Sequence, residues 1–157
     1  MNLFYLDKNL QKNAEYHVNS HCIKQILESC QIICTVFHLQ GIQAPYKPTH
    51  ARHPSSLSAQ RTRENFEWVI SYCSCLADEY TFRYGKIHKS TEVVEWVQKN
   101  KHLLSFEKQR LTEFALAMPD EFKTSCPIES YRNYYREAKK HLHCWTKRDK
   151  PSWLRKK

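Results

Sequence analysis

The sequence predicts an all-α protein, a compact bundle of about five helices that begins with a short extended arm. The first observation is the scarcity of glycine, with 2 Gly and 6 Pro in 157 residues, because a chain poor in glycine forms few tight hairpin turns. The second is that apolar residues recur at helical spacing over long stretches. The third is a hydrophobic content of 41%, which is enough to bury one core. We expect one helical domain over residues 1–146 and a basic C-terminal tail over 147–157.

The N-terminal half is predicted to hold the arm and two long helices. Residues 2–6 are mostly apolar and suit a strand or an extended arm packed into the core. Residues 15–39 carry an apolar stripe at helical spacing. Residues 44–58 contain prolines and basic residues, and they predict a stiff loop of the kind that often carries function. Residues 58–84 carry a second apolar stripe, which ends at Gly85.

The C-terminal half is predicted to hold three shorter helices. Residues 90–97 begin with a Ser-Thr pair that can cap a helix, and valines follow at helical spacing. The apolar residues of 106–117 suggest another helix, which stops before Pro119. Pro127 is well placed to open the last helix, over 127–145.

The chain is strongly basic, with a formal net charge of +9 and a pI near 9.2. An excess of this kind attracts polyanions, either nucleic acid or an anionic membrane surface. No apolar run reaches the ~18 residues of a membrane span, and the first residues lack the basic region of a signal peptide. The 9 Tyr and 4 Trp add rings on which bases can stack. We therefore expect a monomer that binds DNA and no membrane, in the cytoplasm or a host-cell interior, near the nucleoid or nucleus. The alternative is an ordinary basic surface.

The cysteines predict buried thiols and no disulfide framework. There are 7 of them, an odd number, and no Cys-x2-Cys pair occurs. Most sit at apolar positions of the predicted helices, where cysteine acts as a small hydrophobic residue. These positions are Cys22, Cys30, Cys34, Cys73 and Cys144.

The helix predicted over 15–39 carries the most informative polar pattern. Its members follow at intervals of three, four and three residues: His21, Lys24, Glu28 and Gln31. Because seven residues make almost two helical turns, His21 and Glu28 share a face beside the apolar stripe. Such a set at the edge of the core predicts a pocket, or a satisfied surface network in which Lys24 pairs with Glu28.

Two histidine pairs have spacings that suit a metal ion. His17 and His21 are four residues apart, and His50 and His53 are three apart. Neither pair has a nearby third ligand in a motif such as His-Glu-x2-His. We therefore expect no metal and no cofactor.

Basic and hydrogen-bonding residues gather in the proline-rich loop and after it. Arginine matches the geometry of phosphate, and asparagine reads an adenine edge or a phosphate. Cations at the end of the second helix are also favoured by the helix dipole, so Arg83 and Lys86 have a second explanation. The predicted nucleic-acid contacts are Lys24, Tyr46, Lys47, His50, Arg52, His53, Arg61, Arg63, Asn65, Arg83 and Lys86.

The order of these motifs resembles a known family. The motifs are Leu6-Asp7, His21-x6-Glu28, Tyr46 with His53-Pro54, and Glu79-x3-Arg83-Tyr84-Gly85. This order is similar to that of the small all-helical pyrimidine-dimer DNA glycosylases of phages and bacteria, the endonuclease V type. It is closer still to a set of uncharacterised phage proteins that share His-x2-Lys, Tyr-Lys-Pro-Thr-His, His-Pro, Glu-Tyr-x2-Arg-Tyr-Gly and the Met-Pro-Asp-Glu-Phe run at 118–122. The resemblance spans most of the chain through short motifs.

The resemblance implies a DNA glycosylase with AP-lyase activity on damaged or modified bases. In that family the α-amino group attacks C1′ of the damaged nucleotide, and the resulting imine permits β-elimination of the strand. Met1 would supply this amine, and Glu28 would stabilise the sugar cation and move protons. An α-amine titrates near 7.7–8.0 and a lysine at about 10.4, so far more of the amine is neutral and nucleophilic near pH 7.5.

The chain departs from the family pattern near the amine and near the acid. The family exposes a small residue by removing the initiating methionine, whereas Asn2 is too bulky for that step, so the amine belongs to Met1. Neutral Gln25 and Ser29 stand where the family carries a basic pair beside the acid.

Two other classes of function stay open. One is a viral base-modifying or nucleotide-handling enzyme with an acid–base or metal site built from His21, Glu28, His50 and His53. The other is a non-catalytic protein that binds nucleic acid or a host partner. Loss of activity on chelation would favour the former, and salt-dependent binding without turnover would favour the latter.

Overall fold

The structure is a computed structural model that describes residues 2–155. Within them it contains six α-helices and four short 3₁₀ turns and no strand, which confirms the predicted all-α class. The helices are α1 Leu10–Tyr16, α2 Asn19–Leu39, α3 Pro54–Arg61, α4 Arg63–Tyr84, α5 Thr91–Asn100 and α6 Pro127–Glu137. The 3₁₀ turns are Lys101–Leu103, Asp120–Phe122, Lys140–Leu142 and Ser152–Leu154. None of the described helices is long and apolar enough to cross a membrane.

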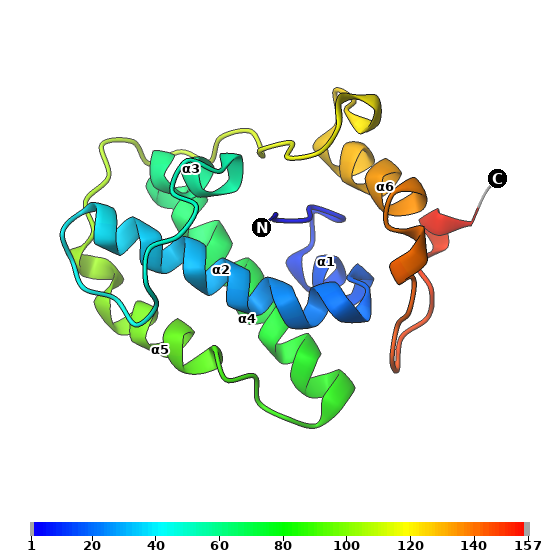
Figure 1. Ribbon diagram of the computed structural model, residues 1–157, viewed down its shortest axis with the longest axis horizontal. Helices are drawn as coiled ribbons and strands as arrows, with labels where there is room; N and C mark the ends of the chain where they lie inside the picture. The colour runs from blue at the N-terminus through cyan, green and yellow to red at the C-terminus, as the bar shows by residue number, and fades with distance from the viewer. Residues whose placement is uncertain (1, 156–157) are drawn as a thin grey trace.

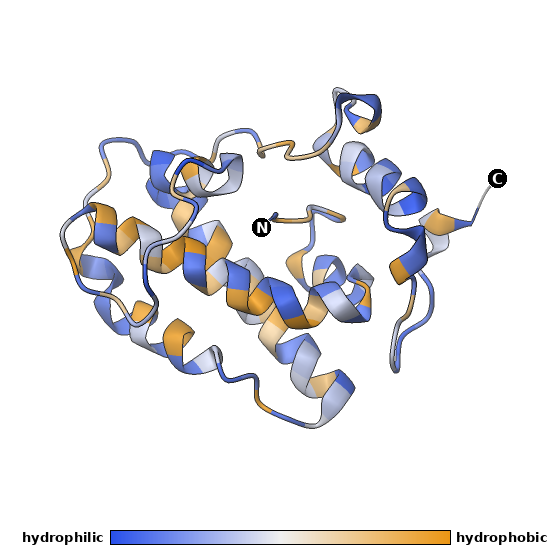
Figure 2. Ribbon diagram, in the orientation of Figure 1, coloured by the Kyte–Doolittle hydropathy of each residue, from blue (hydrophilic) through white to orange (hydrophobic). Residues whose placement is uncertain are grey.

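The two longest helices, α2 and α4, form the centre of the molecule, and the other elements surround them (Figure 1). Their apolar residues face one another in the main core, as the orange bands of α2 in Figure 2 illustrate. Ile33 and Phe37 of α2 and Phe66 and Ile70 of α4 are almost completely buried there. Packing against α4 fixes the orientation of α2, and with it the direction of the polar face of α2.

The N-terminal arm connects two hydrophobic clusters. Leu3 belongs to the main core. Phe4 belongs to a smaller cluster with Val18 and with Tyr131 and Tyr135 of α6. Because side chains alternate along an extended chain, successive residues of the arm reach both clusters. The predicted extended arm is therefore the structural link between α6 and the rest of the bundle.

The helix predicted over 15–39 is in fact two helices. The backbone of His17 is extended and separates α1 from α2. Arg83 donates to the carbonyl oxygens of Glu15 and His17, each at 2.9 Å. A side chain distant in sequence thus satisfies the end of α1, where carbonyls have no intrahelical donor.

The helix predicted over 58–84 is also divided, at Thr62. This residue is extended, and its hydroxyl accepts the backbone N–H of Asn65 at 3.1 Å, which caps α4. α3 begins with Pro54, and the ring of His53 caps it. The chain therefore turns between α3 and α4 without losing the apolar pattern that predicted one helix.

The prediction of a helix over 106–117 is wrong, because this segment is extended. Its carbonyl groups accept hydrogen bonds from the start of α4. The backbone N–H of Arg63 donates to Lys108 O, and that of Glu64 donates to Gln109 O, both at 3.0 Å. The first N–H groups of a helix need acceptors from elsewhere, and this segment provides them.

The C-terminal part of the chain is packed against the bundle. α6 ends at Glu137, earlier than the predicted boundary at 145, and a 3₁₀ turn follows. Leu154 is buried, and Trp153 makes an edge contact with Tyr16 at 5.7 Å between ring centroids. The described part of the predicted basic tail, 147–155, is thus in contact with the domain.

Candidate functional site

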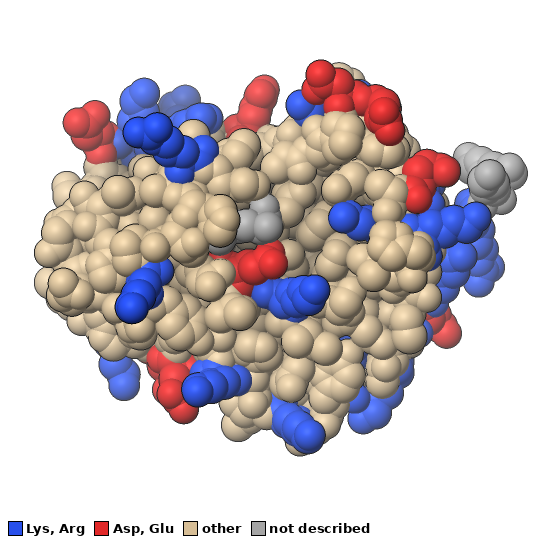
Figure 3. Space-filling view, viewed as in Figure 1, with Lys and Arg blue, Asp and Glu red and all other residues tan. Residues whose placement is uncertain are grey.

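A cavity of about 540 Å³ lies between α2, the N-terminal arm and the segment that follows α6. Figure 3 shows acidic and basic side chains side by side in the centre of this face. The volume falls within the range of about 300–1,000 Å³ that is usual for small-molecule sites. The cavity is lined by Asn2, Phe4, Ser20, His21, Lys24, Gln25, Glu28, Ala117, Tyr134, Lys139, His141 and Leu142.

Three residues that the sequence placed on one helical face meet in this cavity. His21, Lys24 and Glu28 all project from α2 into it. Glu28 is half-buried, and its Oε2 accepts a hydrogen bond of 2.9 Å from Nε2 of Gln25. Of the charged lining residues Glu28 is acidic, whereas Lys24 and Lys139 are basic. The cavity therefore combines a carboxylate inside with cations at its walls.

His21 is held as a neutral imidazole. Burial and the neighbouring His17 lower the pKa of His21 to about 3. Its ring stacks on Phe4 at 4.3 Å between centroids, and its Nδ1 lies 2.7 Å from the hydroxyl of Tyr135. That hydroxyl accepts the backbone N–H of Val18, so its own proton is directed to Nδ1. The proton of His21 is then on Nε2, which makes His21 a hydrogen-bond donor to an occupant and a poor proton acceptor at neutral pH.

Two further polar atoms of the cavity lining have no protein partner within residues 2–155. Gln25 is 3% exposed, and its Oε1 is buried without a hydrogen bond. The carboxylate of Glu28 accepts a hydrogen bond and so must face the amide nitrogen of Gln25. The amide oxygen of Gln25 is therefore the atom that lacks a partner. The hydroxyl of Ser20 is also buried and unpaired. An unsatisfied buried polar group costs about 1–3 kcal/mol, so these atoms suit a polar occupant.

The arm fixes the second residue of the chain at the edge of the cavity. The amide nitrogen of Asn2 donates to Ala117 O at 2.7 Å, and its Oδ1 lies 3.0 Å from the Tyr131 hydroxyl. Further along the arm, Leu6 N–H donates to Asn13 Oδ1 at 2.6 Å. Both amide atoms of Asn2 are thus held by the protein. Met1, the predicted nucleophile, lies outside the described residues.

The proline-rich loop ends at His53, which does not line the cavity. Burial lowers the pKa of His53, the charge of His50 lowers it further, and the charge of Glu28 acts in the opposite direction. Lys47, His50 and Arg52 of the same loop are exposed. These loop cations are available at the surface, as the prediction of nucleic-acid contacts requires.

Tyr46 has a structural position instead. Its hydroxyl lies 2.9 Å from the Ser90 hydroxyl before α5, and its carbonyl oxygen accepts from His38 at 2.9 Å. Tyr46 does not line the cavity. It anchors the loop to α2 and α5, so the prediction that it contacts nucleic acid finds no support in its position.

Arg63 and Asn65 are likewise committed to the framework. Arg63 donates to Lys101 O at 3.1 Å and to Leu104 O at 2.6 Å. Asn65 is 4% exposed and donates to Thr112 Oγ1 at 2.6 Å. These bonds hold the segment after α5 against α4, and they use polar groups of Arg63 and Asn65 that the predicted DNA contacts would need.

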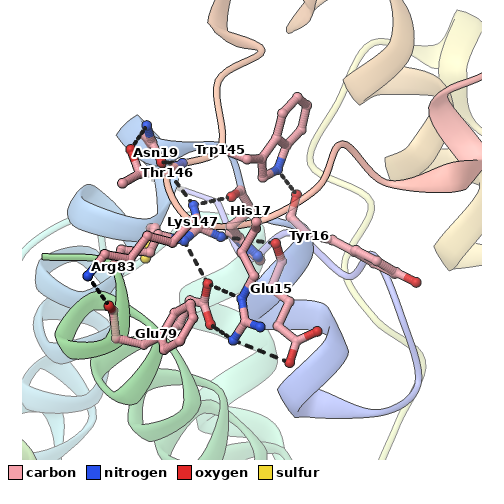
Figure 4. Close-up of polar contacts among 12 residues, drawn as sticks. Glu15, Tyr16, His17, Asn19, Glu79, Arg83, Trp145, Thr146 and Lys147 are labelled. Atoms are coloured by element: carbon pink, nitrogen blue, oxygen red, sulfur yellow. Dashed lines mark hydrogen bonds and ion pairs between the residues drawn. The ribbon is translucent and has the colours of Figure 1, made fainter.

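Arg83 lies in a buried network of polar contacts near the end of α4 (Figure 4). It is 2% exposed, and its Nε donates to Oε1 of Glu79 at 2.7 Å. Its Nη1 also donates to Asn19 Oδ1 at 3.1 Å. Arg148 donates to both carboxylate oxygens of Glu79, at 3.0 and 2.9 Å. The hydrogen-bonding groups of Arg83 are used inside the fold, so its position does not support the predicted phosphate contact.

Arg61 and Lys86 remain exposed but outside the cavity. Arg61 lines a separate hollow of about 290 Å³ that also involves Pro54 and Phe114. Lys86 follows α4, which ends at the bottom of the view in Figure 1. Neither residue is among those that line the cavity, so a role at this site would require a large ligand.

The opposite wall of the cavity was not predicted. Lys139, His141 and Tyr134 line it, and Nζ of Lys139 lies 4.8 Å from the centre of the Tyr134 ring. These residues follow the end of α2 by 95 positions or more, and no local pattern connects them to it. Gln25, in contrast, is three residues before Glu28, a spacing that brings side chains together on a helix.

The histidine pairs considered as metal ligands have other partners. Nδ1 of His17 donates to Asn13 O at 2.7 Å, and its Nε2 accepts from the Tyr72 hydroxyl at 2.8 Å. Nδ1 of His50 lies 2.6 Å from the Thr49 hydroxyl. Within residues 2–155, no group of three His, Cys, Asp or Glu side chains is placed to hold a metal ion.

We expect stability to fall on mild acidification because two histidines are buried. Burial lowers the pKa of both His17 and His21 from 6.5 to about 3. The unfolded chain takes up protons as the pH falls below 6.5, and the folded chain does not until near 3. The stabilising contribution is therefore complete above pH 6.5 and is lost below it, at up to about 1.4 kcal/mol per pH unit for each histidine. Urea unfolding at pH 7.5, 6 and 5 measures this loss, and equal unfolding free energies at all three would contradict it.

Comparison with protein families, with curated proteins and with solved structures finds no match to this chain. The chemistry of the cavity is therefore the basis for the function proposed next.

Proposed function

We propose that the protein is a DNA glycosylase with AP-lyase activity that acts on a damaged or modified base. The observation that carries this proposal is the placement of Glu28 in a cavity of about 540 Å³ with basic walls, at whose edge Asn2 is fixed. Asn2, the first residue that the structure describes, and the carboxylate of Glu28 border the same cavity. The resemblance to the glycosylase family implies an α-amino group and a carboxylate at one site.

The size and polarity of the cavity suit an extruded nucleotide. Enzymes that act on a base rotate it out of the duplex into a pocket and recognise its edge by hydrogen bonds. Gln25 Oε1 can accept a hydrogen bond, and Nε2 of His21 can donate one. Lys24 and Lys139 supply positive charge for the flanking phosphates. Phe4 and Tyr134 provide aromatic surface in the same lining.

The proposed reaction uses the α-amino group of the chain. Its nitrogen forms a bond to C1′ as the bond from C1′ to the base breaks, and the base leaves with the electron pair and takes a proton. Loss of a proton from nitrogen and opening of the sugar ring give an imine. Removal of a proton from C2′ then breaks the C3′–O bond and cuts the strand. Glu28 stabilises the cationic sugar in the first step and accepts the proton in the last.

Trapping with borohydride tests this proposal directly. We expect the protein to be linked covalently to abasic-site duplex DNA when borohydride is present, because reduction converts the imine to a stable amine. Acetylation of the α-amino group should abolish the product. A panel of ultraviolet-treated, uracil-containing and hypermodified duplexes would identify the base that is removed.

The same experiment separates the competing functions. A His/Glu acid–base enzyme would turn over without trapping, but a pKa of about 3 makes His21 a weak base for proton transfer near neutral pH. A non-catalytic binder would show salt-dependent affinity and no product on any duplex. Absence of a trapped species on abasic DNA would refute the lyase chemistry.

A further inference from the structure

We propose that a second basic pocket, on the other side of the segment that follows α6, binds a phosphate of the DNA backbone. This inference takes its partner, DNA, from the function proposed above. The pocket has a volume of about 210 Å³ and does not share a lining residue with the cavity. It is lined by Arg136, Glu137, Lys140, His143, Lys150 and Leu154.

The charge of this pocket favours an anion. Among the lining residues Arg136, Lys140 and Lys150 are basic, and Glu137 is acidic and exposed. Glu129 adds a second carboxylate beside the pocket, because its Oε2 lies 3.7 Å from Nη1 of Arg136. Figure 3 shows Lys and Arg side chains gathered at the right-hand edge of the molecule, where Figure 1 places α6 and the C-terminal segment. A net positive pocket that is small and polar suits a phosphate group better than a base.

Arg136 is held in position for such a contact. Its Nε donates to Trp153 O at 3.1 Å, and its Nη1 donates to Asn133 Oδ1 at 2.6 Å. These bonds leave Nη2 without a hydrogen bond among the described residues. The side chain of His143 is also oriented, because its Nε2 donates to Tyr135 O at 2.9 Å. The fixed guanidinium donor of Arg136 loses little conformational entropy when an anion binds.

One short segment contributes to both sites. Lys139 and His141 line the cavity, whereas Lys140 and His143 line the basic pocket. Lys139 and His143 are four positions apart, so their backbones lie at most about 14 Å from one another. Phosphates along one strand rise by about 3.4 Å per nucleotide. When one nucleotide of a strand is extruded into the cavity, a phosphate of the same strand can therefore reach the pocket. That phosphate lies within about four nucleotides of the extruded one.

The test is the salt dependence of DNA binding by the double variant Lys140→Ala/Lys150→Ala. Both side chains are exposed, so the replacement should leave the fold intact. Affinity for abasic-site duplex is measured by fluorescence anisotropy between 50 and 200 mM KCl, as a probe of counterion release. We expect the slope of log K against log[salt] to decrease in magnitude by roughly 0.9, the value for one phosphate that is no longer neutralised. The matched control, Lys99→Ala/Lys108→Ala, removes the same charge from exposed positions elsewhere and should retain the wild-type slope.

The outcomes distinguish this inference from the proposed chemistry. A reduced slope with unchanged trapping at saturating DNA supports the pocket. A reduced slope without trapping by any form supports the pocket while the lyase proposal fails. An unchanged slope, or the same reduction in the control, overturns the pocket even where trapping succeeds. If inorganic phosphate shifts the NMR signals of Lys140 and His143 but the DNA slope does not change, the pocket takes a small phosphate ligand and the DNA assignment is overturned.

Discussion

Replacement of Glu28 by glutamine is expected to slow strand cutting by about 10²–10⁴-fold and to leave DNA binding nearly unchanged. The amide has the shape of the carboxylate, and it can still accept the 2.9 Å hydrogen bond from Gln25. It cannot accept a proton from C2′ or balance positive charge on the sugar. The measurement is the single-turnover rate of cutting on an abasic-site duplex, with affinity measured on the same DNA.

A charge-matched control separates chemistry from electrostatics. Glu95→Gln removes one carboxylate from the exposed side of α5 and should cut DNA at the wild-type rate. Glu28→Gln should also unfold within a few degrees of the wild-type protein, because Glu28 is only half-buried. Cutting by Glu28→Gln at the wild-type rate would eliminate the role proposed for this residue.

Replacement of Arg83 by methionine is expected to reduce the free energy of unfolding by about 3–5 kcal/mol, the usual cost of removing one partner of a buried ion pair. The guanidinium pairs with Glu79 at 2.7 Å inside the fold. It also satisfies the carbonyl oxygens of Glu15 and His17 at the end of α1. Methionine fills similar volume but leaves these acceptors without donors. For a chain of this size the loss corresponds to a decrease in Tm of roughly 10 °C.

The neighbouring Lys86 provides the comparison. Lys86→Met changes an exposed cation near the same helix end and should alter the unfolding free energy by less than about 0.5 kcal/mol. The double variant Glu79→Gln/Arg83→Met should lose less than the two single variants added together, because the residues share one network. A loss below 1 kcal/mol for Arg83→Met would show that Arg148 alone is sufficient to balance Glu79.

Several features could be predicted from the sequence because they depend on local periodicity. The apolar stripes predicted the all-α class and the positions of α2 and α4, although each predicted helix is divided by a cap. The spacing of His21, Lys24 and Glu28 placed them on one face, and the structure shows that this face lines a cavity. A helix repeats every 3.6 residues, so residues within a few turns of one another reveal their shared face without tertiary information.

Only the tertiary structure decided how the chain ends its helices and closes its cavity. Residues 106–117 have a helical pattern, yet they are extended because their carbonyls accept the first N–H groups of α4. Arginine is a residue type that often contacts DNA, yet Arg83 is buried because Glu79 and the end of α1 surround it. Lys139 and His141 complete the wall opposite α2. These outcomes depend on hydrogen bonds and ion pairs between residues far apart in the chain, and no local pattern encodes which distant group will satisfy a given donor or acceptor.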